Sequence, residues 1–192
     1  MFRLIRLLIA VRGGPPASFE GPPDRAHGGH DALSLRAAAY VAHDGSLYGD
    51  RALAWLAARG VRQWEPGEVT LDEVRRQVAA GEWDGLRDDD GPVAALRLLW
   101  QDEQVWGPQP AVAGYVHGLV VAGRRRGAGT GAALLQWAAH QARAQGRSLL
   151  RLDCGEDNDA RRRYYAEQGL RPVGRRGTDG RWYSVVLLER PL

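Results

Sequence analysis

The segment RRRGAGTGAALLQWA at 124–138 constrains the fold of this chain most, because it opens a helix directly after a strand. Its glycines at 127, 129 and 131 leave the turn without side chains, so a bulky group can approach the backbone closely. The N–H groups of a helix start point outward and favour negative charge, and Arg126 adds positive charge. The segment therefore predicts a phosphate or pyrophosphate site in an α/β chain.

Several kinds of site fit this segment. A glycine-rich turn can simply begin a helix. The letters GAGTGA also fit the dinucleotide pattern G-x-G-x-x-A, with Asp153 near the expected offset for a ribose ligand. However, too few residues follow to complete a doubly wound sheet, and the absence of a GK[ST] sequence excludes a P-loop. The remaining interpretation, coenzyme A, depends on a second motif.

That second motif is NDARRRYYAEQGLRPVG at 158–174, after the next strand. Its Asn158, Tyr165 and Gly169 match, position for position, a segment of the GNAT acyltransferase superfamily, which the chain resembles. The R-x-x-G-x-G letters of 126–131 resemble the acetyl-CoA loop of that superfamily, and HGLVV at 117–121 resembles its central strand. Segments 55–68 and 150–154 resemble actinobacterial members.

The resemblance implies a single α/β (α+β) domain with a mixed, mostly antiparallel sheet, flanking helices and splayed central strands. Acetyl-CoA is the implied cosubstrate, with its pantetheine arm beside Leu119, Val120 and Val121. The pyrophosphate contacts of the family map onto the backbone amides of Gly127, Ala128, Gly129, Thr130, Gly131 and Ala132. Asn158 is expected to hydrogen-bond the pantetheine arm or the start of its own helix.

The resemblance also implies catalytic roles. Tyr165 is expected near the CoA sulfur as a general acid, and Tyr164 is a competing candidate that we expect to be buried. His117, whose side chain titrates in the useful range, is the candidate general base. A buried, inert histidine fits equally well, and Asp102, Glu103 or a water chain could replace it.

Other residues near the motifs have plainer interpretations. Asp153 is expected to cap or brace the sheet, and Cys154 to be a small core residue. The arginines at 124–126 and 161–163 form either a solvated surface or contacts with the phosphates of CoA. One or two tryptophans are expected to line the acceptor pocket, the candidates being Trp55, Trp64, Trp100 and Trp106.

Periodicity predicts the remaining elements. Strands are expected at 33–38, 83–87, 92–100, 113–121, 148–154, 170–173 and 182–189. Helices are expected at 49–59, after an N-cap at Thr70, at 129–145 and at 159–168, with a polar loop at 101–110. Residues 1–31 are interpreted as a flexible or extraneous arm and 32–192 as the acyltransferase domain. The apolar start of the arm is either extraneous or an appended strand.

Composition excludes several classes of protein. Cys154 is the one cysteine, which rules out an intramolecular disulfide and a cysteine-based zinc site. We therefore expect a reducing, cytoplasmic compartment and no metal. A net charge of +3 with interspersed acidic residues disfavours a nucleic-acid partner. No stretch approaches the ~20 apolar residues of a membrane helix, so no membrane partner is expected. Whether the protein forms a homodimer stays open.

Together these features predict an N-acetyltransferase that moves an acetyl group from acetyl-CoA to a primary amine of a small molecule by direct attack in a ternary complex. A backbone N–H near 119–121 is expected to stabilise the oxyanion. The alternatives are a non-catalytic acyl-CoA-binding module, an enzyme for longer acyl chains, and a dinucleotide-binding oxidoreductase.

Overall fold

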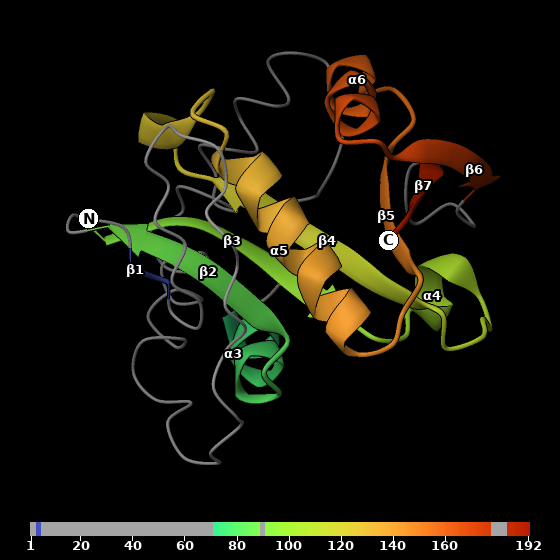
Figure 1. Cartoon of the computed structure of the whole chain (residues 1–192), viewed down its shortest axis with the longest axis horizontal. Coiled ribbons are helices and arrows are strands. Elements are labelled where there is room, and N and C mark those ends of the chain that lie inside the picture. The colour runs from blue at the N-terminus through green and yellow to red at the C-terminus, as the bar shows by residue number, and fades with distance from the viewer. Residues whose placement is uncertain (1–2, 5–70, 89–90, 178–183) are drawn as a thin grey trace.

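The computed structural model describes residues 3–4, 71–88, 91–177 and 184–192 (Figure 1). Its elements, in chain order, are β1 Arg3–Leu4, α3 Leu71–Ala79, β2 Trp83–Asp88, β3 Gly91–Leu99, α4 Glu103–Trp106, β4 Ala113–Val121, the 3₁₀ turn η1 Gly123–Arg125, α5 Thr130–Ala144, β5 Leu149–Gly155, α6 Asp159–Glu167, β6 Arg171–Arg176 and β7 Val185–Pro191. None of the described helices is long and apolar enough to cross a membrane.

The described strands form one sheet in the order β1-β2-β3-β4-β5-β7-β6. Only β4 and β5 run parallel to one another, and every other neighbouring pair is antiparallel. The long helix α5 connects the two parallel strands and crosses the sheet diagonally (Figure 1). The predicted mixed, mostly antiparallel sheet with flanking helices is confirmed.

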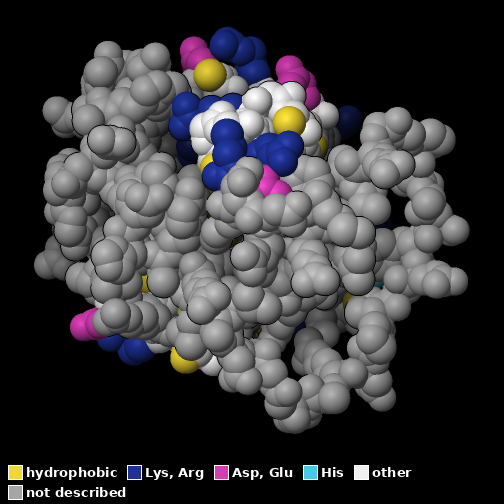
Figure 2. All heavy atoms as spheres, turned by 90° about the vertical axis from the view of Figure 1, so that its left-hand side faces the viewer, with side chains coloured by type: hydrophobic (Ala, Val, Ile, Leu, Met, Phe, Trp, Pro, Cys, Tyr) yellow, Lys and Arg dark blue, Asp and Glu magenta, His cyan; other side chains and the backbone are white. Residues whose placement is uncertain are grey.

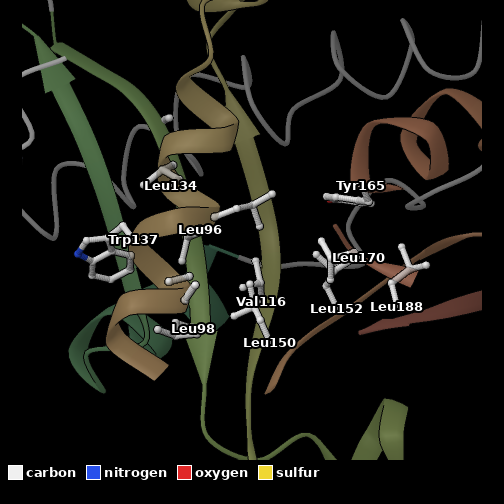
Figure 3. Close-up of a cluster of buried hydrophobic side chains, with 14 of the residues drawn as sticks. Leu96, Leu98, Val116, Leu134, Trp137, Leu150, Leu152, Tyr165, Leu170 and Leu188 are labelled. Carbon is white, nitrogen blue, oxygen red and sulfur yellow. The ribbon is translucent and has the colours of Figure 1, made fainter. Parts of the chain in front are cut away.

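Helix α5 packs on the sheet through one apolar face. Leu134, Leu135, Ala138 and Ala142 recur at helical spacing and are all buried. Figure 3 shows Leu134 of α5 beside Leu96 and Leu98 of β3. The approach is close, because a Cβ added at Gly114 of β4 would lie 3.0 Å from the Cβ of Ala142. Small residues at this contact therefore set the position of α5 and of the loop before it.

One predicted loop is wrong. The segment 101–110 contains the short helix α4, which begins because the Asp102 side chain caps it: Oδ1 accepts a hydrogen bond from the Val105 N–H at 3.2 Å. The helix ends at Gly107, whose φ is +68°. Trp106 of α4 is buried with its ring edge against Tyr115, the centroids being 5.9 Å apart. A polar N-cap and one buried tryptophan thus create a helical turn that is too short to show a period.

The N-terminal residues Arg3 and Leu4 pair antiparallel with Arg87 and Leu86 at the edge of the sheet. This arrangement matches the appended-strand alternative for the start of the chain. The predicted strand 33–38, the helix 49–59 and the Thr70 cap lie outside the described residues, and the boundary between an arm at 1–31 and a domain at 32–192 stays a prediction.

Candidate active site

The two parallel strands separate halfway along their length. Their ladder ends at the pair of Val116 and Leu152, although β4 continues to Val121 and β5 to Gly155. Beyond that pair each strand keeps its outer neighbour, β3 for β4 and β7 for β5. A wedge therefore opens between the carboxyl-terminal halves of β4 and β5, and this is the splay expected of the central strands.

A bulge in β4 lies at the start of this wedge. The register with β3 pairs Arg97 with His117 and Ala95 with Val120, so two residues of β4 face one residue of β3. Gly118 sits in the bulge with φ +58°, a conformation that glycine adopts without a Cβ penalty. The sequence analysis did not single out Gly118, although an isolated glycine within a strand pattern is a signal for a bulge.

The residues predicted to border pantetheine follow this bulge. Val120 is buried and Val121 half-buried, and both pair with β3. Leu119 shares the bulge with Gly118 and lines a cavity of about 400 Å³ at the wedge. The cavity is also lined by Asp102, His117, Asp153, Cys154, Tyr165 and Arg161. The candidate general base and the candidate general acid therefore border the same cavity.

His117 lies between two carboxylates. Its Nε2 is 3.0 Å from Oδ2 of Asp102, and its Nδ1 is 3.8 Å from Oδ1 of Asp153. Burial raises the pKa of Asp153, and the negative charge of Asp102 raises it further, while His117 lowers it. If Nε2 donates its hydrogen to Asp102, the lone pair of Nδ1 stays available for a proton. Asp153 was expected to cap or brace the sheet, and its side chain also lines the cavity beside His117.

The two neighbouring tyrosines of α6 have different surroundings. Tyr165 is 6% exposed, belongs to the hydrophobic core and lines the cavity. Figure 3 shows its ring directed from α6 toward the sheet. Burial raises its pKa to about 12, so the hydroxyl keeps its proton at neutral pH. Tyr164 was expected to be buried, but it is only half-buried.

Tyr164 instead packs at the start of α5. A Cβ built on Gly131 would lie 2.6 Å from the Tyr164 hydroxyl, which is closer than real Cβ atoms approach. A side chain at Gly131, in the first turn of α5, would therefore have to displace the Tyr164 hydroxyl. The sequence pattern contains both residues, but their contact depends on how the two helices pack.

The start of α6 is held by Asn158. Its Oδ1 accepts a hydrogen bond from the Arg161 N–H at 3.0 Å, which is one of the two roles expected for it.

Cys154 is buried, and burial raises the pKa of its thiol to about 11. A thiol in this state is a poor nucleophile at neutral pH, so the surroundings of Cys154 fit the expected core residue.

The loop between β4 and α5 is exposed. Gly127 and Gly129 have φ values of +74° and +73°, and no heavy atom lies within 4 Å of a Cβ built on either. Ala128 between them is also exposed, and Arg126 precedes them at the surface. Helix α5 begins at Thr130, and its N-cap residue Gly129 has no side chain that could cap it. The backbone amides of the first turn, which includes Gly131 and Ala132, therefore receive no hydrogen bond from the N-cap side chain.

Two of the loop arginines bind a carboxylate. Arg124 Nη2 lies 3.0 Å from Oδ1 of Asp88, and Arg125 Nη2 lies 2.9 Å from Oδ2. The Asp88 side chain is 6% exposed and ends β2, so these pairs fasten the loop to the β2 edge of the sheet. The turn η1 lies at one side in Figure 1, and Figure 2, which views that side, shows arginine and acidic side chains gathered together. Arg124 and Arg125 were considered as phosphate contacts or solvated surface; each of them pairs with Asp88.

Asp88→Asn is expected to loosen this loop. Burial alone would raise the pKa of Asp88, but the hydrogen bonds from Arg125 and Arg124 outweigh it and hold the pKa below its usual value. Removing the charge should cost about 1.5–3 kcal/mol of unfolding free energy at pH 7. Because the folded-state pKa is depressed, wild type should lose this advantage as pH falls below about 4. Urea denaturation at pH 7 and pH 3 measures both effects, with the exposed Glu167→Gln as control. Equal unfolding free energies of Asp88→Asn and wild type at pH 7 would contradict a stabilising role for the ion pairs of Asp88 with Arg124 and Arg125.

The tryptophans divide between core and cavity. Trp106 is buried beside Tyr115, and Trp100 packs partly buried against the main core. Trp83, which was not singled out, lines the cavity, and its Nε1 donates to Oε1 of Gln77 at 2.9 Å. Trp55 and Trp64 lie outside the described residues.

Comparisons with known proteins agree with this geometry. The chain matches the acetyltransferase (GNAT) family over residues 50–170, more than half of its length. It is 30% identical over 133 residues to the uncharacterized N-acetyltransferase YesJ of Bacillus subtilis, covering 65% of this chain and 73% of YesJ.

Solved structures share the fold at low identity. A GNAT-family acetyltransferase from Listeria monocytogenes has a TM-score of 0.63 at 19% identity, covering 85% of this chain and 92% of that one. A GNAT-family acetyltransferase from Elizabethkingia anophelis, solved with acetyl-CoA bound, has a TM-score of 0.50 at 16% identity, covering 63% and 82%. The chain therefore belongs to the GNAT family and is an acetyl-CoA-dependent acyltransferase.

Proposed function

We propose that this acyltransferase moves an acetyl group from acetyl-CoA to the primary amine of a small molecule by direct attack in a ternary complex. The observation that carries the proposal is the wedge between β4 and β5, which meets a cavity of about 400 Å³ lined by His117 and Tyr165. A cavity of this size suits a small ligand.

The donor site follows from the wedge and the loop. The pantetheine arm would lie along Leu119, Val120 and Val121, where β4 has lost its partner on the β5 side. The pyrophosphate would lie on the backbone amides of 127–132 at the start of α5. The backbone amides and the positive charge of the exposed Arg126 would supply the attraction for this anion, and Asp88 offsets part of the charge of Arg124 and Arg125.

The acceptor would enter the cavity as an ammonium ion. His117, oriented by Asp102, would take its proton, and the neutral amine would attack the thioester carbonyl. The C–N bond forms while the C–S bond breaks, and a backbone N–H near Leu119 would stabilise the oxyanion. Tyr165 would donate its proton to the leaving thiolate, and the second proton that the nitrogen loses as the amide forms would restore the Tyr165 hydroxyl. Much of the acceleration would come from holding amine and thioester together.

Acetyl-CoA and CoA are expected to stabilise the protein, whereas NADPH and ATP should not. A ligand at ~100 times its dissociation constant adds about 2.7 kcal/mol, which at this chain length raises the melting temperature by roughly 5–11 °C. A thermal-shift series with the four ligands measures this. A shift with NADPH alone would support a dinucleotide site and overturn the proposal.

The acceptor is then sought by following CoA release with a thiol reagent across a panel of small amines. Turnover of a peptide N-terminus but of no small amine would contradict the small-molecule part of the proposal. Binding of acetyl-CoA without turnover of any amine or peptide would favour the non-catalytic module.

A further inference from the structure

Asp102, His117 and Asp153 bring three metal-ligating side chains together at the cavity. One donor atom from each lies within 4.8 Å of a donor atom of each of the others, and no other such group occurs in the described part of the chain. The three come from separate elements, the N-cap of α4, β4 and β5. The chain spacing of these residues therefore gives no metal motif, and the expectation of no metal was drawn from the single cysteine alone.

The donor atoms are oriented for an ion. Oδ1 of Asp102 accepts the Val105 N–H, which leaves Oδ2 directed at Nε2 of His117 at 3.0 Å. Metal–ligand bonds of about 2.0–2.1 Å place neighbouring ligand atoms roughly 3 Å apart. The backbone hydrogen bond to Asp102 is the kind of outer contact that fixes a metal-binding carboxylate. Oδ1 of Asp153 lies 3.8 Å from Nδ1, the other ring nitrogen, and one donor atom of each of the three residues lies within 4.8 Å of the others.

The charges around the group favour a cation. Two carboxylates face one imidazole. Of the two arginines that line the cavity, Arg97 is paired with Glu82 at 2.7 Å. The two carboxylates of the group therefore outnumber the single positive charge that its imidazole can carry.

We propose that Asp102, His117 and Asp153 bind a divalent first-row transition-metal ion such as Zn²⁺, with water in the cavity completing its coordination. Carboxylate oxygen and imidazole nitrogen are ligands that this ion accepts. The ion would occupy the lone pair of His117 and both carboxylates. If the proposed acetyl transfer is correct, Zn²⁺ therefore inhibits it by competing with the acceptor amine and not with acetyl-CoA.

The first experiment measures Zn²⁺ binding to the chelator-treated, tag-free protein by competition with a chromophoric zinc indicator. Asp102→Asn, His117→Gln and Asp153→Asn are each expected to weaken binding by at least about 10–100-fold, the loss seen when even an outer partner of a metal ligand is removed. Glu103→Gln, which lines the same cavity outside the group, should bind as wild type does. Because the chain has five histidines, the difference between variants is the readout and not the total zinc bound.

Two results would overturn the site: zinc binding unchanged in all three ligand variants, or weakened equally by Glu103→Gln. Circular dichroism of each variant separates lost binding from lost folding, and Asp102→Glu should recover part of the affinity in a folded protein. The second experiment measures inhibition, where Zn²⁺ should raise the apparent KM for the amine and leave that for acetyl-CoA within about twofold of its value. Zinc binding without acetyl transfer would contradict only the proposed function, and acetyl transfer without zinc binding only the metal site.

Discussion

Tyr165→Phe is expected to lower kcat for acetyl transfer by about 100-fold while leaving the KM for acetyl-CoA nearly unchanged. The substitution removes only the hydroxyl and keeps the ring in the core that Tyr165 shares with Leu152 and Leu170. The effect lies at the low end for general acid catalysis because a thiolate is a comparatively good leaving group. Steady-state kinetics with saturating amine measures it.

Tyr164→Phe is the matched control, because its ring lies 5.4 Å from that of Tyr165 on the same helix. Its hydroxyl lies near Gly131 at the start of α5, so we expect a change of less than about threefold in kcat, the scale of an ordinary surface substitution. A larger loss for Tyr164→Phe than for Tyr165→Phe would exchange their roles.

The pH dependence adds a second check on Tyr165. Burial raises its pKa to about 12, so it remains a proton donor up to about pH 11 and should cause no fall in kcat below pH 10. A basic limb near pH 9 that vanishes in Tyr165→Phe would contradict this. Since the folded-state pKa exceeds the ordinary value near 10, the fold should also lose stability as pH rises from about 10 toward 12.

Periodicity and turn chemistry predicted the elements that carry the wedge. The strand at 113–121 is observed with the expected bounds, and the helix expected at 129–145 spans Thr130–Ala144. Both are long, with glycine at their ends and strong apolar patterns, so local preference and core packing agree. The helix α4 was missed because its four residues are too few to show a period. The Asp102 cap and the buried Trp106 at its end stabilise it instead.

The site was predicted less completely than the fold because its contacts join distant segments. The motifs gave Tyr165 and His117 separately, but the cavity between them depends on where the β4–β5 ladder ends. The distance from His117 to Asp153 depends on how far β4 and β5 move apart beyond that point. Sequence spacing carries no information on which carboxylate faces a given imidazole.

The arginines of the loop illustrate the same limit. Three consecutive arginines before a glycine-rich turn favour a phosphate site by charge alone. In the structure, two of these arginines, Arg124 and Arg125, pair with Asp88. Asp88 lies 36 residues before Arg124 in the chain. A hairpin strand that returns beside β4 creates this contact, so only the three-dimensional arrangement assigns each charge to its partner.

Leu152→Ala is expected to destabilise the fold by about 3 kcal/mol, within the usual 2–5 kcal/mol for truncating a buried leucine. Leu152 is 1% exposed and pairs with Val116 at the last rung before the wedge opens. Figure 3 shows its side chain beside Leu170 and Leu188, so the truncation leaves a cavity that these neighbours border. The melting temperature should fall by roughly 6–12 °C for a chain of this length.

Val173→Ala serves as the control, because Val173 is 53% exposed on β6 and its truncation opens no interior space. Its unfolding free energy should stay within about 0.5 kcal/mol of wild type. If Leu152→Ala changed the unfolding free energy as little as Val173→Ala does, the packing of Leu152 would not be what holds β4 and β5 together at their last pair, Val116 and Leu152. If it has the expected effect, the KM for acetyl-CoA should rise as well, because the width of the wedge depends on where that ladder ends.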